Sequence, residues 1–169
     1  MGQFGASQQS FTFQSIPQNA AELAALPEAA LTSPFQASAL TVLALMRYVQ
    51  DTQAGIELLN HLKGPQPLSP YEQQFLRDRL RDKLYLPNSY FSGATPQNNY
   101  TPSLPLTITV MEDPYSYAEA GYAKLLLRSS GADQPRPIKL RAKGQTQWFL
   151  WEQFLLSDIR QPVADDPWA

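Results

Sequence analysis

The stretch that most constrains the fold of this chain runs from Pro105 to Phe154, where short segments show the alternation of β-strands. The first segment alternates Leu, Ile and Val with Thr and Met, and the last is rich in Trp, Phe and Leu. Gly or Pro residues lie between the segments, which span 106–111, 122–128, 136–142 and 148–154. A period of two, interrupted by turn-forming residues, predicts an antiparallel meander.

The first half of the chain predicts helices. Ser33 supplies an N-cap and Pro34 a first helical residue for a helix that continues to about Val49. Apolar residues cover most of the circumference of this helix, so it must be largely buried. We expect it to lie across the inner face of the sheet. Asp51 can cap a second helix that ends before Gly64.

Shorter signals complete the expected secondary structure. Ser69 and Glu72 form a capping box for a third long helix that runs to about Lys83. Asn19 caps a short helix. The alternation within residues 10–16 predicts a first strand that pairs with the later sheet.

These elements predict an α+β fold, with the N-terminal helices packed on one face of a four- or five-stranded antiparallel sheet. A length of 169 residues suits a single domain, which we expect to span residues 1–169. Within it, residues 1–9 are expected to be flexible and residues 161–169 to form an extended tail.

Composition excludes several kinds of chemistry. The chain has no cysteine, which excludes disulfides, thiolate catalysis, zinc–thiolate sites and iron–sulfur clusters. His61 is the only histidine, and none of the 8 glycines belongs to a phosphate-binding or dinucleotide-binding motif. We therefore expect no metal and no cofactor. A net charge of -2 argues against a general nucleic-acid binder.

Signals for membrane insertion or export are also missing from the sequence. The first residues show neither a positively charged region nor an apolar core of the secretory type. The longest apolar stretch, around residues 39–46, is too short to span a bilayer. The expectation is a cytoplasmic protein with no membrane partner.

Residues 84–104 show neither a helical nor a strand period. A connection of this length within a compact domain is usually functional or disordered, and its aromatic residues favour an ordered loop packed on the domain. Our preferred hypothesis is a non-enzymatic binding or protein-interaction module whose site lies where this loop meets the sheet. The candidate ligand-binding residues are Tyr90, Asn98, Asn99 and Tyr100.

Three segments resemble a family of uncharacterised bacterial proteins known as a domain of unknown function. They are the loop sequence SYFSGATPQNNYTP from Ser89 to Pro102, the segment Asp113–Tyr117, and the ending WFLWEQFLLSDIRQP from Trp148 to Pro162. The similarity covers nearly the whole chain. It implies a bacterial, cytoplasmic protein, and it implies no activity, cofactor or catalytic residue.

The two middle strand segments predict a cationic outer face. If their Leu and Ile residues face the core, Lys124, Arg128, Lys139 and Arg141 share the opposite face. Such alternation is normal for the solvated side of an antiparallel sheet. The functional alternative is the binding of an anion or polyanion by these residues.

The last strand segment is apolar on both faces, with Trp148 on one face and Phe149 and Trp151 on the other. One aromatic pair must therefore lie on the outer side, where something should cover it. The candidates are the 84–104 loop, the tail with Trp168, or a partner subunit. These three aromatic residues are thus candidate interface residues, and a homo-oligomer is one form that the partner can take.

An enzyme is the remaining alternative, and the sequence favours it least. Acid–base catalysis by carboxylates needs two carboxyl groups that face a common cleft. Glu112, Asp113 and Glu152 are the candidates, because Glu152 on the last strand segment could face Glu112. Asp113 followed by Pro114 is more simply explained as a turn.

Overall fold

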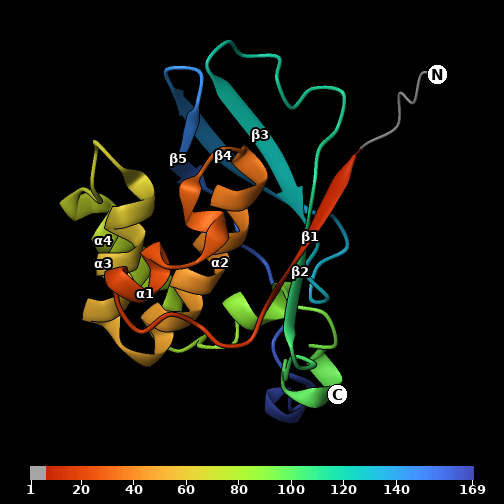
Figure 1. Cartoon of the computed structure of the whole chain (residues 1–169). Coiled ribbons are helices and arrows are strands. Elements are labelled where there is room, and N and C mark those ends of the chain that lie inside the picture. The colour runs from red at the N-terminus through yellow and green to blue at the C-terminus, as the bar shows by residue number, and fades with distance from the viewer. Residues whose placement is uncertain (1–6) are drawn as a thin grey trace.

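The computed structural model describes residues 7–169 and shows a five-stranded antiparallel sheet with helices against one of its faces (Figure 1). The α+β fold is therefore confirmed. The strands are adjacent in chain order, and they are β1 (Gln8–Phe13), β2 (Leu106–Met111), β3 (Tyr122–Leu127), β4 (Arg136–Lys143) and β5 (Gln147–Gln153). The four segments of the predicted meander are thus strands β2 to β5.

The helices are α1 (Ala20–Ala24), α2 (Pro34–Gln50), α3 (Thr52–Lys63) and α4 (Pro70–Leu80). Each begins with the predicted cap: the side chains of Asn19, Ser33, Asp51 and Ser69 accept hydrogen bonds from backbone N–H groups of the first turn. The capping box of Ser69 and Glu72 is present, although α4 ends three residues earlier than expected.

Helix α2 forms the centre of the core. It lies against β2, β3, β4 and β5, and most of its residues are buried. Its buried hydroxyl groups have partners within the helix, because Ser38 donates to the carbonyl of Pro34 and Thr41 to that of Ala37. Within residues 7–169, no helix has both the length and the apolar character needed to cross a membrane.

Strand β1 begins earlier than the sequence suggested. It pairs with β2 along its whole length, and its inner side carries Phe11 and Phe13. Residues 1–9 were expected to be flexible, and of these, residues 1–6 lie outside the described part of the chain. Gln8 and Gln9 belong to β1 instead, because they pair with Met111 and Val110.

Strands β2 and β3 separate soon after they meet, and the 84–104 loop enters the gap. The two strands pair only at Val110–Leu127 and Met111–Leu126. Loop residue Ser92 donates its N–H to the carbonyl of Thr107 on β2, at 2.9 Å. On the other side, the carbonyl of Ser89 accepts from the N–H of Ser130, which follows β3, at 3.0 Å. The loop therefore takes the place of a strand in this part of the sheet.

The C-terminal residues behave only partly as predicted. Leu155, Leu156 and Ile159 are buried and close the core. Residues 161–169 were expected to be extended, but residues 163–165 form a 3-10 turn that lies against the loop turn Pro96–Asn98. Trp168 is 93% exposed, so its ring covers nothing.

Candidate functional site

The loop and the sheet enclose an open cleft of about 550 Å³. We call it the loop–sheet cleft. Its walls are loop residues 89–95, the outer face of β2 at Thr109 and Met111, and the segment 128–134 that follows β3. It exists because β2 and β3 diverge and because the loop does not fill the whole gap. It lies where the sequence led us to expect the loop to meet the sheet.

The two candidate tyrosines hold the loop in place. Tyr90 is 4% exposed and donates its hydroxyl to the carbonyl of Leu155. Tyr100 is fully buried, donates to the carbonyl of Arg160 at 2.5 Å, and stacks on Tyr85 with 5.2 Å between the ring centroids. Burial raises the pKa of Tyr100 to about 12 and also raises that of Tyr90. A hydroxyl that is buried and already donating is poorly placed to meet a ligand.

The contact between Tyr100 and the C-terminal segment depends on Gly131. A Cβ atom at that position would lie 2.2 Å from the Tyr100 hydroxyl and 2.7 Å from a methyl group of Ile159. The Arg160 N–H also donates to the Gly131 carbonyl, at 2.9 Å. The loop, the turn after β3 and the C-terminal segment therefore meet at one glycine.

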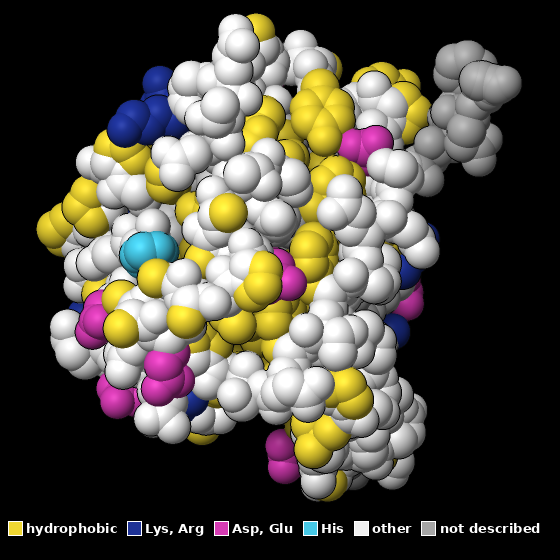
Figure 2. All heavy atoms as spheres, viewed as in Figure 1, with side chains coloured by type: hydrophobic (Ala, Val, Ile, Leu, Met, Phe, Trp, Pro, Cys, Tyr) yellow, Lys and Arg dark blue, Asp and Glu magenta, His cyan; other side chains and the backbone are white. Residues whose placement is uncertain are grey.

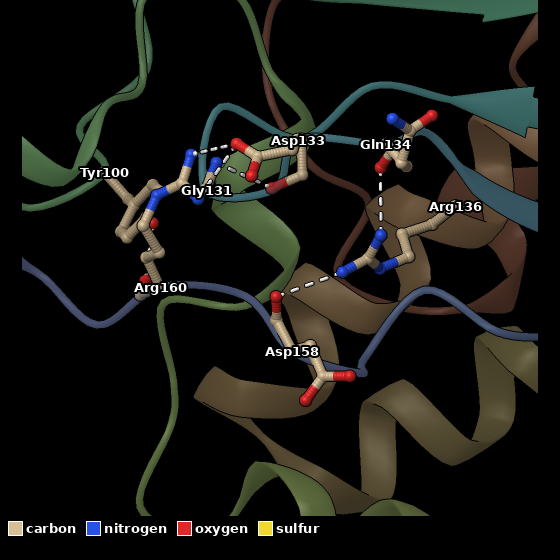
Figure 3. Close-up of polar contacts among 8 residues, drawn as sticks. Tyr100, Gly131, Asp133, Gln134, Arg136, Asp158 and Arg160 are labelled. Carbon is tan, nitrogen blue, oxygen red and sulfur yellow. Dashed lines mark hydrogen bonds and ion pairs between the residues drawn. The ribbon is translucent and has the colours of Figure 1, made fainter.

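Figure 3 shows the polar contacts around this junction. The guanidinium of Arg160 points to the carboxylate of Asp133, at 3.2 Å. Arg136 donates to the carbonyls of Gln134 and Asp158 at 2.9 and 3.0 Å, and its Nε donates to the carbonyl of Ser157. These two arginines tie the C-terminal segment to the sheet, so their charges are engaged by the protein itself.

Asn98 also has a structural role. Its Oδ1 accepts from the N–H groups of Thr95 and Thr101 at 2.9 and 3.0 Å, and its Nδ2 donates to the carbonyl of Gly93 at 2.7 Å. Asn99 is exposed and has a left-handed backbone with φ of 57°. Of the four candidate ligand-binding residues, only Tyr90 lines the loop–sheet cleft.

The cleft presents a second set of polar groups that the protein leaves free. Within residues 7–169, the side chains of Ser92, Arg128, Ser130 and Gln134 make no hydrogen bond or ion pair. All four line the cleft. Of these four residues, only Arg128 was predicted from the sequence, because it continues the alternation of the strand segment 122–128. Isolated serine and glutamine residues give no such signal.

The cationic stripe is divided in the structure. Lys124 and Lys139 are cross-strand partners on the outer face, and Lys139 forms an ion pair with Glu119 at 2.7 Å. The guanidinium of Arg141 lies 4.7 Å from the ring centroid of Trp151. Arg128 lies beyond the end of β3 and lines the loop–sheet cleft. One charge of the stripe is therefore paired with a carboxylate, and another lies over an aromatic ring.

The aromatic residues of β5 are half-buried by their own domain. Trp148 packs against the core, and Phe149 packs against Gly64, where a Cβ atom would lie 2.4 Å from its ring. The ring of Trp151 meets Tyr122 edge-on at 5.7 Å. A register shift between Lys139 and Leu140 changes the pairing at this point. The outer aromatic pair is thus covered by the end of α3 and by outer-face side chains.

Two backbone groups on the edge of β5 have partners outside the sheet. The N–H of Trp148 donates to the carbonyl of Leu31, and Lys63 donates to the carbonyl of Trp151 at 3.1 Å. Lys63 is 6% exposed and pairs with Glu72 at 2.8 Å. Burial alone would raise the pKa of Glu72, but the hydrogen bonds from Lys63 and Ser69 hold it below its ordinary value. A smaller cavity of about 290 Å³ lies beside this pair, between α4 and β5.

The structure does not bring the candidate carboxylates together. Glu112 follows β2 and accepts from the hydroxyl of Ser7, whereas Glu152 lies on β5 opposite Lys139. Strands β3 and β4 lie between them, so roughly 14 Å or more separates the two backbones. Asp113 accepts from the N–H of Tyr115, at 2.8 Å, in the predicted turn.

The described residues form no cluster of metal-binding side chains. In the part of the chain that the structure describes, no group of three or more His, Asp or Glu side chains is placed to hold a metal ion. His61 lies on the surface near the end of α3 (Figure 2). On the face shown there, acidic and basic side chains are scattered and form no continuous charged patch.

Comparison with known protein families agrees with the resemblance drawn from the loop and the C-terminal sequence. A family model described as "Domain of unknown function (DUF6935)" matches residues 15–163. The chain belongs to this family. The match spans α1 to β5 and includes the whole loop–sheet cleft except Gln8. Searches among curated proteins and among solved structures found no match.

Proposed function

We propose that this protein is a binding module and that the loop–sheet cleft holds a small polar ligand. The observation that carries the proposal is the set of free polar groups in the cleft. Ser92 and Ser130 provide hydroxyls, Gln134 an amide and Arg128 a guanidinium, and within residues 7–169 none of these side chains makes a hydrogen bond or ion pair. A cleft of about 550 Å³ has the size of a small-molecule site.

The rigidity of the loop also supports this proposal. Binding sites are effective when the binding groups are held in place before the ligand arrives. Tyr90 and Tyr100 fix the loop to the C-terminal segment, and Asn98 fixes its internal turn. The loop is therefore already shaped on one side, while its other side faces the cleft. A cytoplasmic location and the presence of a protein partner or second subunit stay predictions.

The test is a ligand screen read by amide chemical shifts. The isotopically labelled full chain is titrated with a panel of sugars, amino acids, carboxylic acids and phosphate monoesters. We expect at least one class to shift the amides of residues 92–95 and 128–132 together. Shifts confined to other places, such as the cavity between α4 and β5, would contradict the proposal.

A matched pair of variants sharpens the screen. Ser92→Trp places a large ring in the cleft at a side chain that makes no hydrogen bond within residues 7–169. Gln97→Trp places the same ring on the exposed part of the same loop, outside the cleft. Binding should be lost in Ser92→Trp and kept in Gln97→Trp. Equal binding by two folded variants would count against the cleft.

A further inference from the structure

The charge of the loop–sheet cleft comes from one residue. Among the described residues (7–169) that line it, Arg128 is the only charged one, and none is Asp or Glu. This is notable in a chain whose net charge is -2. With no carboxylate among these lining residues, the guanidinium of Arg128 is their one formal charge, and it favours an anion.

Arg128 also differs from the other arginines of the chain. The other seven each donate to a protein oxygen, approach a carboxylate or lie over an aromatic ring; they are Arg47, Arg77, Arg79, Arg81, Arg136, Arg141 and Arg160. Arg128 has none of these contacts with residues 7–169. A guanidinium presents five N–H donors in a planar fork that matches a carboxylate or phosphate group.

We infer that the loop–sheet cleft recognises the oxyanion group, phosphate or carboxylate, of a small molecule, with Arg128 as the charged contact and the hydroxyls of Ser92 and Ser130 as further donors. This inference rests on the proposed function and specifies its ligand class. Charge-assisted hydrogen bonds of this kind are about twice as strong as neutral ones.

A small anion fits the surroundings better than a polyanion does. A nucleic acid or a sulfated polysaccharide needs a continuous track of cations. The neighbouring stripe does not provide one, because Lys139 is paired with Glu119 and Arg141 lies over Trp151. Arg128 is also on the cleft side, at the end of β3, and not in the middle of that face.

Three probes that share a carbon skeleton test the inference: glycerol 3-phosphate, glycerate and glycerol. Each is titrated into the labelled full chain at constant sodium chloride concentration. We expect the phosphate, the carboxylate or both to shift the amides of Ser92 and Ser130, and glycerol to leave them in place. Comparison of the two anions identifies which oxyanion the cleft prefers.

Two variants with the same loss of charge show whether Arg128 is responsible. Arg128→Gln should weaken binding of the preferred anion at least about tenfold, because it removes a charged hydrogen-bonding group. Lys124→Gln removes the same charge from β3, outside the cleft, and it should change binding by less than about twofold because salt screens that charge. Arg128→Lys keeps the charge but not the fork, and it should bind with intermediate affinity. Thermal unfolding of each variant verifies that it is folded.

Several results would overturn the inference. If glycerol binds as well as the anions, or if Arg128→Gln binds like the unmodified chain, the cleft is a ligand site without anion selectivity. The inference about anions then fails, while the proposed function as a binding module stands. If the anions shift the amide signals of Lys124 and Lys139 on the outer face, the anion site lies there and not in the cleft. The same conclusion follows if heparin binds and Arg128→Gln and Lys124→Gln weaken its binding equally. If neither these probes nor the wider panel shifts the cleft amides, both proposals fail.

Discussion

The two sides of the 84–104 loop differ in how their polar groups are used. On one side, which we call the anchored side, Tyr90, Asn98 and Tyr100 form hydrogen bonds with backbone groups of the protein. On the other, the cleft side, Ser92 lines an open cleft together with Arg128 and Ser130, and within residues 7–169 these side chains make no hydrogen bond or ion pair. The aromatic and amide residues that stand out in the loop sequence thus have structural roles, whereas a serine without any sequence signal has a side chain free for binding.

The comparison leads to opposite expectations for mutations. Changes on the anchored side should lower the free energy of unfolding, because each disturbs hydrogen bonds or packing that hold the loop in place. Changes on the cleft side should leave stability almost unchanged and alter binding only. The expected effect on stability is largest for Gly131→Ala and smallest for the changes on the cleft side, and each measurement tests the distinction between the two sides.

The largest effect is expected from Gly131→Ala. The new methyl group would collide with the Tyr100 hydroxyl and with Ile159, so the loop and the C-terminal segment must move apart. We expect a loss of about 3 kcal/mol from overpacking and the weakened hydrogen bond. Urea unfolding measures it. Gly121→Ala is the control: its Cβ meets nothing within 4 Å, and its positive φ should cost about 1 kcal/mol. Equal losses of stability in the two variants would show that Gly131 is not tightly packed against Tyr100 and Ile159.

Alkaline pH should weaken the anchored side through the ionisation of Tyr100. The pKa of Tyr100 is raised from 10.0 to about 12, so folding favours its protonated form. This contribution to stability is complete below about pH 10, and it is lost as the pH rises through the folded-state pKa of about 12. The measurement is urea unfolding across this range for the unmodified chain and for Tyr100→Phe, which lacks the titration. Identical pH profiles would contradict the prediction, and Tyr115→Phe, at an exposed site, serves as control.

At neutral pH, Tyr100→Phe and Tyr90→Phe should each destabilise the fold by about 1–2 kcal/mol. Each variant keeps the ring but leaves the carbonyl of Arg160 or Leu155 without its donor. Denaturant unfolding gives the value for each. A ligand found for the cleft should still bind to both folded variants; a large loss of affinity would mean that these hydroxyls meet the ligand after all.

Asn98→Ala should cost about 1 kcal/mol, because Thr95 and Thr101 lose the acceptor for their N–H groups. Asn98→Asp keeps the acceptor oxygens and loses only the donor to Gly93, so its stability should lie between that of the unmodified chain and that of Asn98→Ala. Hydrogen exchange of the Thr95 and Thr101 amides is the measurement. Protection in Asn98→Ala equal to that of the unmodified chain would rule out a role in shaping the loop.

The smallest effect is expected on the cleft side. Ser92→Ala and Arg128→Gln remove groups that have no partner within residues 7–169, so each should change the free energy of unfolding by less than about 0.5 kcal/mol. The same unfolding experiment applies. A loss above about 1.5 kcal/mol from either change would place that residue on the anchored side.

The sequence predicted local structure well because local structure has local causes. The caps at Ser33, Asp51 and Ser69 act within a few residues, and the alternation from Leu106 to Met111 depends on one strand. Tyr90 and Tyr100 were assigned to a ligand because their partners, the carbonyls of Leu155 and Arg160, lie 60 or more residues away. No sequence spacing indicates such contacts.

The cleft itself was even less accessible to prediction. It results from the divergence of β2 and β3, which pair at only two positions, and from the entry of Ser89 and Ser92 into the gap. Arg128 was identified as a candidate, but in the company of Lys124, Lys139 and Arg141 on the outer face. Because Arg128 lies one residue beyond the end of β3, it lines the cleft, whereas Lys124, Lys139 and Arg141 do not.

The most direct test of the central claim is a crystal structure of the protein with the preferred anion, glycerol 3-phosphate or glycerate, bound. The account predicts the oxyanion group beside the guanidinium of Arg128, within hydrogen-bond distance of Ser92 or Ser130, while Tyr90 and Tyr100 keep their contacts with Leu155 and Arg160. A ligand bound on the outer face at Lys124 and Lys139, or one held by the tyrosine hydroxyls after the loop has moved, would contradict it.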